Sequence, residues 1–211
     1  MKHILRTLAL PAALAAALVL ASCGTSSGDD GHGTVDMNGQ ATGAPGAGGP
    51  PATGAKNDAD VQFATMMIPH HSQAVEMADL AIKGATDPRI KALAPKIKAA
   101  QSPEISRMSG WLTGWGAPVP GAADDMSGMS GQAGGMMSAG QMADLGSATG
   151  SAFDRMWLQM MIEHHEGAVA MARTGLAEGT NPEGKRLAQS IVDGQSGEIA
   201  EMKSILAGIP G

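Results

Sequence analysis

The feature that most constrains this chain is a stretch of sequence that occurs twice. Met66–Ala78 reads MMIPHHSQAVEMA, and Met160–Ala172 repeats it as MMIEHHEGAVAMA. The repeat continues beyond these segments at a constant offset of 94 residues, the separation of His70 from His164, without a gap. Two copies of one sequence predict two copies of one structural unit, so we expect an internal duplication.

Each copy has the pattern of a helical hairpin. The first helix is predicted over about 59–83 and ends at Gly84, a residue type common at helix ends. Asp87-Pro88 and Asn181-Pro182 then supply an N-cap residue followed by proline in the first helical turn. The second helices are expected to end near Trp115 and Leu206. Interior prolines in the first copy predict kinks without a change of topology, namely Pro69, Pro95 and Pro103.

Two hairpins that each have one apolar face can bury those faces by packing into a four-helix bundle. The predicted fold class is therefore all-α, a bundle made of two duplicated hairpins within residues 58–211. The hairpins cover 58–115 and 151–207, and a methionine-rich connector with a short helix near 141–146 covers 116–150. The connector methionines either capture Cu(I) or belong to a low-complexity linker, and they are Met126, Met129, Met136, Met137 and Met142.

The N-terminus has the pattern of an export signal. A short basic region precedes an apolar run over 8–20, and Leu20-Ala21-Ser22 leads directly to Cys23, the only cysteine. This pattern predicts a lipoprotein signal peptide over 1–22, with Cys23 lipidated and the protein extracytoplasmic, anchored to a bacterial cell membrane. The alternative is an ordinary signal peptide followed by an unmodified thiol. Residues 23–57 are rich in Gly, Ala, Pro, Ser and Thr and predict a disordered tether.

Composition excludes two other sources of stability and binding. A single cysteine allows no disulfide within one chain, so the domain must be stabilised by a packed core. The formal net charge of −6 argues against nucleic acid as a partner.

Helical stepping of about 100° per residue places each His-His pair within the apolar arc of its helix, beside methionines. Buried imidazoles need partners, because an unpaired buried polar group costs about 1–3 kcal/mol. Thioether and imidazole together favour a soft to borderline transition metal. We therefore predict ten metal-binding residues: His70, His71, His164, His165, Met66, Met67, Met77, Met160, Met161 and Met171.

The second helices carry polar residues on the face that should be apolar. Gln101 and Glu104, with Gln195 and Glu198 in the second copy, are expected to hydrogen-bond to the histidines; direct ligation is the alternative. The ion is expected to be copper, as Cu(I), ahead of iron or zinc. Its affinity should fall as pH drops through the imidazole titration near roughly 6.5. Two plainer interpretations remain open, methionines that only fill the core and histidines that are only hydrogen-bonded.

The pattern Met-Ile-x-His-His-x-x-Ala-Val-x-Met-Ala, followed by Gln-x-x-Glu-Ile-x-x-Met, resembles the domain-of-unknown-function 305 family over about residues 58–207. The resemblance implies a ferritin-like four-helix bundle, export, and an association with copper binding and tolerance. The di-iron ferritin pattern of paired Glu-x-x-His motifs is not present, which argues against oxidase chemistry.

The function expected from the sequence is therefore that of a lipid-anchored copper-binding protein, not an enzyme, which buffers the metal, confers tolerance or delivers copper to an unidentified partner protein. The alternatives are a ferritin-like metal-dependent oxidase and a structural or partner-binding bundle without metal.

Overall fold

The computed structural model describes residues 54–121 and 134–209, and in these residues every regular element is a helix. The elements are α1 (Asp58–Gly84), α2 (Pro88–Gly114), α3 (Ala139–Ser147), α4 (Gly150–Glu178) and α5 (Pro182–Ala207). The predicted all-α class is confirmed. The signal peptide, Cys23, the greater part of the tether, Met126 and Met129 lie outside the described residues.

The helices begin where the sequence places capping residues. Asn57 and Asp60 form a capping box at the start of α1, in which each side chain accepts a hydrogen bond from the backbone of the other. Asp87 and Asn181 are the N-cap residues of α2 and α5, and each is followed by proline in the first helical turn. The interior prolines do not end α1 or α2, so the first hairpin keeps the same topology as the second.

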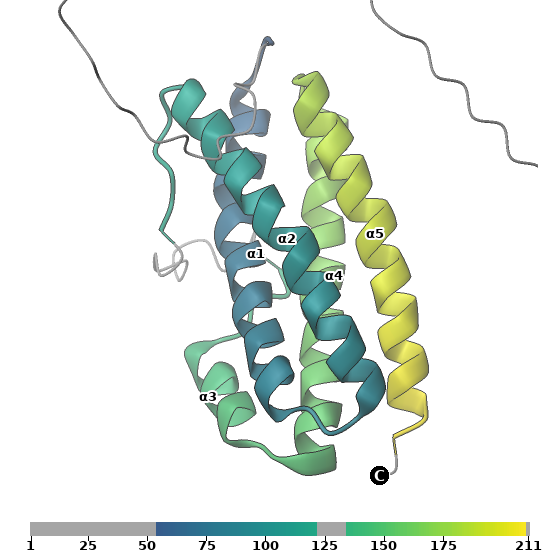
Figure 1. The fold of residues 1–211 in the computed structure, drawn as a ribbon. Helices are drawn as coiled ribbons and strands as arrows, with labels where there is room; N and C mark the ends of the chain where they lie inside the picture. Colours follow the sequence, from purple (N-terminus) through teal and green to yellow (C-terminus); the bar gives the residue numbers. More distant parts are fainter. Residues whose placement is uncertain (1–53, 122–133, 210–211) are drawn as a thin grey trace, which may run out of the picture. The chain divides into compact units, whose positions relative to one another are not determined.

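The helices form two antiparallel hairpins, α1 with α2 and α4 with α5, which pack together as a bundle through α1 and α4 (Figure 1). The short helix α3 lies against one end of this bundle, on the side of α1 and α4 that is away from α2 and α5 (Figure 1). In the part of the chain that the structure describes, no helix combines the length and the apolar character that a bilayer crossing requires.

The core has two apolar clusters, one toward each end of the bundle. One contains Met77, Trp157 and Met160 and is completed by Met137 and Leu145 of the connector. Trp157 donates its indole N–H to the carbonyl oxygen of Met77 at 2.8 Å, so its one polar atom is satisfied within this cluster. The other cluster is built around Phe63, Met67, Met108, Trp111 and Leu187. The histidine helices run through both clusters.

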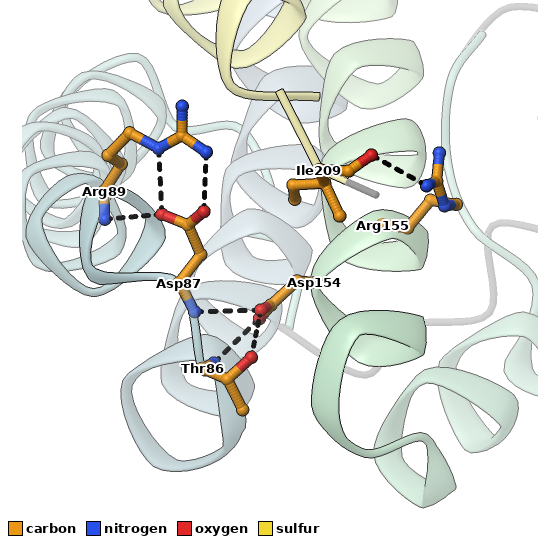
Figure 2. A network of polar contacts seen from close by, with 6 residues as sticks. All are labelled: Thr86, Asp87, Arg89, Asp154, Arg155 and Ile209. Carbon is orange, nitrogen blue, oxygen red and sulfur yellow. Dashed lines mark hydrogen bonds and ion pairs between the residues drawn. The ribbon is translucent and has the colours of Figure 1, made fainter. Parts of the chain in front are cut away.

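Two buried carboxylates join the hairpins reciprocally. Asp154 of α4 accepts hydrogen bonds from the backbone N–H groups of Thr86 and Asp87, at 2.9 and 2.8 Å, and from the Thr86 hydroxyl (Figure 2). Asp60 of α1 accepts from the equivalent groups of Thr180 and Asn181 at 3.0–3.1 Å. Each hairpin therefore supplies the carboxylate that satisfies the turn of the other hairpin, which fixes the register between α1 and α4.

Candidate metal centre

The four histidines of the two His-His pairs lie inside the bundle, on the two helices that face each other. His70 and His71 lie on α1, His164 and His165 lie on α4, and the exposed fraction of each residue is 0%. The sequence predicted this inward direction, and the structure confirms it. Imidazoles that are withdrawn from water in this way must find partners within the protein or remain unsatisfied.

The outer histidine of each pair is held by a glutamate from the second helix of its own hairpin. His71 Nε2 lies 2.8 Å from Oε2 of Glu104, and His165 Nε2 lies 2.8 Å from Oε2 of Glu198. Both carboxylates are mostly buried, with side chains 19% and 21% exposed. A carboxylate accepts, so a neutral imidazole in this pair carries its proton on Nε2 and keeps the lone pair of Nδ1 free.

The inner histidines face each other across the interface between the hairpins. The ring centroids of His70 and His164 are 3.8 Å apart, with an interplanar angle of 43°. His70 Nε2 lies 3.3 Å from the carbonyl oxygen of Gly134, so its N–H donates to the connector backbone. His164 has no hydrogen-bond partner on either ring nitrogen within the described residues. The two copies therefore differ at this point.

All four Nδ1 atoms share one property, which is that each is buried and has no hydrogen-bond partner in the described part of the chain. In three of the rings the Nε2 atom is already engaged by a carboxylate or a carbonyl oxygen. This is the arrangement of metal-binding histidines, in which one ring nitrogen donates to a carboxylate or carbonyl and the other carries the lone pair. The donor atoms offered by these residues are therefore Nδ1 atoms.

Burial keeps the inner imidazoles neutral. It lowers the pKa of His70 to about 3, assisted by the neighbouring charge of His71, while the hydrogen bond to Gly134 acts in the opposite direction. Burial, followed by the charges of the other three histidines, also holds the pKa of His164 well below its ordinary value. The expectation that protons compete at these two residues near pH 6.5 was therefore wrong, because it assumed a solvated imidazole.

The hydrogen bond expected between Gln101 and a histidine is absent within the described residues, whereas the one expected of Gln195 stays a prediction. Both side chains are buried. Within residues 54–121 and 134–209, the amide nitrogen and oxygen of Gln101 and the amide oxygen of Gln195 have no hydrogen-bond partner. Glu104, one turn further along the same face, already occupies the accessible nitrogen of His71. Buried amide atoms without a partner are uncommon in native structures, so these two side chains add polar groups to the interior of the bundle.

The predicted methionines line the histidine helices but belong to different surroundings. Met67, Met77 and Met161 are fully buried in the apolar clusters, and Met160 is 7% exposed. Met66 and Met171, from different copies, line one surface pocket of about 320 Å³ together with Phe63 and Glu178. This pocket joins thioethers of the two copies, and none of the four histidines lines it.

In the described residues, no group of three or more His, Cys, Asp or Glu side chains converges as a metal site made of those ligands would require. Thioether sulfur and backbone oxygen lie outside that set of ligands. The orphaned Nδ1 atoms fit a soft ion of low coordination number better than they fit a hard ion that needs several oxygen ligands.

Sequence reasoning missed three residues at this centre: Gly134, Gln73 and Gly167. Gly134 lies in the low-complexity connector, where no periodic pattern indicates contact with a helix. Gln73 and Gly167 occupy equivalent positions in the two copies, and the available signal was that they differ where their neighbours are nearly the same.

Known proteins resemble this chain in sequence and in fold. The sequence model of the domain of unknown function DUF305 matches residues 60–206. A DUF305 protein from Streptomyces coelicolor, described as a candidate secreted protein, is 36% identical with a TM-score of 0.64, covering 71% of this chain and 92% of that protein. A DUF305 fragment from Deinococcus radiodurans is 32% identical with a TM-score of 0.64, covering 75% and 99%.

CopM in its Cu(I)-bound form is 33% identical with a TM-score of 0.61, covering 72% of this chain and 98% of CopM. CopM has also been solved in Cu(II)-bound and Ag-bound forms. Protein L153 of Acanthamoeba polyphaga mimivirus is 43% identical over 53 residues, which are 25% of this chain and 35% of that protein. The match therefore spans about a third of the viral relative.

Proposed function

The chain belongs to the DUF305 family, and from that premise we propose that it is an extracytoplasmic copper-binding protein that buffers the metal, confers tolerance or delivers copper to a partner. One observation carries the proposal: four buried imidazoles in a single interface each have an Nδ1 atom without a hydrogen-bond partner among the residues that the structure describes. Four such atoms would be destabilising, at about 1–3 kcal/mol each, if they served no ligand. The similarity to CopM, solved with Cu(I), Cu(II) and Ag, favours copper as that ligand.

The inner pair, His70 and His164, would supply the first donors, because their ring centroids lie only 3.8 Å apart between α1 and α4. His71 and His165 would add Nδ1 donors whose rings are oriented by Glu104 and Glu198. In this proposal copper is the transported or stored ion. The protein binds it, orients the donor atoms around it and shields it from water. The role that we propose is binding, without a catalytic step.

Methionine is what would select Cu(I) over other ions. Neutral, soft thioether sulfur strengthens binding of Cu(I) and adds little for Zn(II). Met66 and Met160 each precede a histidine pair by one helical turn, on the same face as the inner histidine. They are the thioethers that we assign to the site first.

The experiment that tests this proposal compares Cu(I) and Zn(II) affinity by competition with chelators in three proteins. Met66→Leu with Met160→Leu keeps side-chain volume and should weaken Cu(I) binding far more than Zn(II) binding. His70→Ala with His164→Ala should weaken both. If the folded methionine variant held Cu(I) as tightly as the parent, the methionines would be core residues only, and the histidines a site of unknown metal.

The lipid anchor is a separate part of the proposal and rests on Leu20-Ala21-Ser22-Cys23. Similarity to a DUF305 protein described as a candidate secreted protein supports an extracytoplasmic location. Cys23→Ala should release the protein from membranes into the soluble fraction, as followed by membrane fractionation of expressing cells. Unchanged membrane partitioning of this variant would remove the anchor and leave the copper site unaffected.

A further inference from the structure

Residues 73 and 167 are the same position of the two copies, but one is glutamine and the other is glycine. Both contact one connector segment, residues 134–137, which we call the strap. The Gln73 amide pairs with both backbone groups of Met137: its Nε2 donates to the carbonyl oxygen at 2.8 Å, and its Oε1 accepts from the N–H at 2.7 Å. The side chain of Gln73 thereby fixes the end of the strap to α1.

At the other end of the strap, Gly167 lets the strap backbone lie directly against α4, because glycine has no side chain. A Cβ at residue 167 would lie 1.7 Å from the carbonyl oxygen of Gly134, a distance that no real contact allows. Gly135 has φ of +86°, and a Cβ there would lie 2.5 Å from the backbone oxygen of Glu163. Only glycines permit this contact between the strap and α4, both for conformation and for space.

The strap crosses from α4 to α1 directly over the inner histidines. Gly134 accepts the hydrogen bond from His70, and the Cβ position of Gly135 lies 3.1 Å from Cα of His164. A single segment that lies between the two copies and runs in one direction cannot make the same contact with both of them. The residue at position 73 therefore binds the strap through its side chain, whereas the residue at position 167 must be small enough for the strap backbone to pack against it.

We propose that the strap is a closure over the histidine centre, with Gln73 and Gly167 as the positioning residues that hold it shut. In the closed form the strap keeps solvent from His70 and His164 and holds the proton of His70 on Nε2, which directs Nδ1 to the interior. When the strap lifts, both rings become accessible. The closure itself stands on geometry alone, while its role in metal entry and exit rests on the proposed function.

The closure is tested in the metal-free, full-length protein by the rate at which diethyl pyrocarbonate modifies each histidine, resolved by mass-spectrometric fragmentation. Gln73→Ala removes two hydrogen bonds, and Gly167→Ala displaces Gly134. Each should raise the rates at His70 and His164 by about tenfold or more. The rates at His71 and His165, which face the glutamates, should stay within about twofold of the parent.

The matched control is Gly194→Ala, because a Cβ at this helical glycine meets no atom within 4 Å. It should leave all four rates unchanged. Unchanged rates at His70 and His164 in Gln73→Ala would overturn the closure. An equal rise at all four histidines would also overturn it, since that pattern reports loosening of the whole bundle.

A second measurement follows Ag(I) as the probe ion, by competition with a chromophoric chelator. Both loading and release should become about tenfold faster in Gln73→Ala, because an open strap removes one barrier common to both directions. Equal rates in variant and parent would overturn the role in metal exchange. If the parent bound neither Ag(I) nor Cu(I), the proposed function would fail, while the modification rates would still decide the closure.

Discussion

At the residue scale, the centre is defined by which ring nitrogen of each histidine forms a hydrogen bond with the protein and which one is left for a ligand. Glu104 and Glu198 engage Nε2 of His71 and His165 at the same 2.8 Å distance. A carboxylate on one ring nitrogen fixes the orientation of the ring and makes the other nitrogen a better donor. The glutamates therefore act through the histidines and need not touch the ion.

We expect Glu104→Gln with Glu198→Gln to lower Cu(I) affinity by about 10- to 100-fold, the usual effect of removing such a partner. The amide keeps the shape and can still accept a hydrogen bond, so the fold should be retained. Chelator competition measures the affinity, and circular dichroism checks the helix content. As a control, Glu166→Gln changes an exposed glutamate beside the second histidine pair, which is paired with Lys203, and should leave affinity unchanged. An unaltered affinity in the double variant would mean that the outer histidines do not bind copper.

At the element scale, the hairpins are held in register by their reciprocal carboxylates. Asp60 is 4% exposed and accepts hydrogen bonds from Asn57, Thr180 and Asn181. Burial alone would raise the pKa of Asp60, but the hydrogen bonds from these backbone N–H groups and the Thr180 hydroxyl outweigh it and leave the pKa lowered. The carboxylate is thus a stabilising connection between α1 and the turn before α5.

Asp60→Ala should lower the free energy of unfolding by about 2–4 kcal/mol, because several buried N–H groups lose their acceptor. For a domain of this size that corresponds to a decrease in Tm of about 10 °C. Asp154→Ala should have a similar effect, since it interrupts the equivalent connection. Asp58→Ala is the control: it removes an exposed first-turn carboxylate and should cost only a few tenths of a kcal/mol. Thermal unfolding by circular dichroism compares the variants, and equal Tm values for Asp60→Ala and Asp58→Ala would contradict this role.

The sequence predicts the elements well because their signals are local. Proline after Asp87 and Asn181, and the apolar period around each His-His pair, depend only on neighbours along the chain, and the helices follow them. The reciprocal carboxylates and the strap could not be predicted in this way. Asp60 meets residues 120 positions away, and Met137 meets Gln73 across 64 positions, so no local pattern encodes these contacts.

The candidate site likewise has features that follow from local sequence and features that do not. The inward direction of the four histidines follows from helical stepping and is confirmed, whereas the unsatisfied amide of Gln101 is not predictable from its face. Spacing on a helix says which side chains point toward one interior. It does not say which of two polar neighbours, Gln101 or Glu104, reaches the ring.

At the scale of the whole molecule, the apolar core of the bundle also contains a group of buried imidazoles, of which the inner two are kept neutral by burial. The imidazoles of His70 and His164 lie at the contact between the hairpins, and protonating either would place a charge on a fully buried side chain. A bound cation would accept electron density from the lone pairs of these ring nitrogens, and it would stabilise the folded protein because only the folded protein brings them together. Acid and metal should therefore act on stability in opposite directions.

We accordingly expect stability to fall as pH drops below about 6.5, well before the carboxylates titrate. In the unfolded chain both histidines take up protons near the ordinary pKa of about 6.5. In the folded protein the pKa of His70 is lowered to about 3 and that of His164 is well below its ordinary value, so neither ring binds a proton over this interval. The unfolded state then binds more protons, and His70 should lower the free energy of unfolding by roughly 1.4 kcal/mol for each pH unit below about 6.5. His164 should act in the same direction. The lowered pKa of Asp60 adds its own loss only as pH falls below about 3.9, the unfolded value.

Urea unfolding of the metal-free protein at pH 7, 6 and 5 measures this dependence. His70→Gln with His164→Gln removes both titrating rings while leaving polar side chains, and should flatten the slope in this interval whatever its effect on stability at pH 7. The Asp58→Ala variant should keep the slope of the parent, because its carboxylate is exposed. A parent protein equally stable at pH 7 and 5 would mean that the imidazoles of His70 and His164 accept protons within the fold, and the interior would then be hydrated rather than closed.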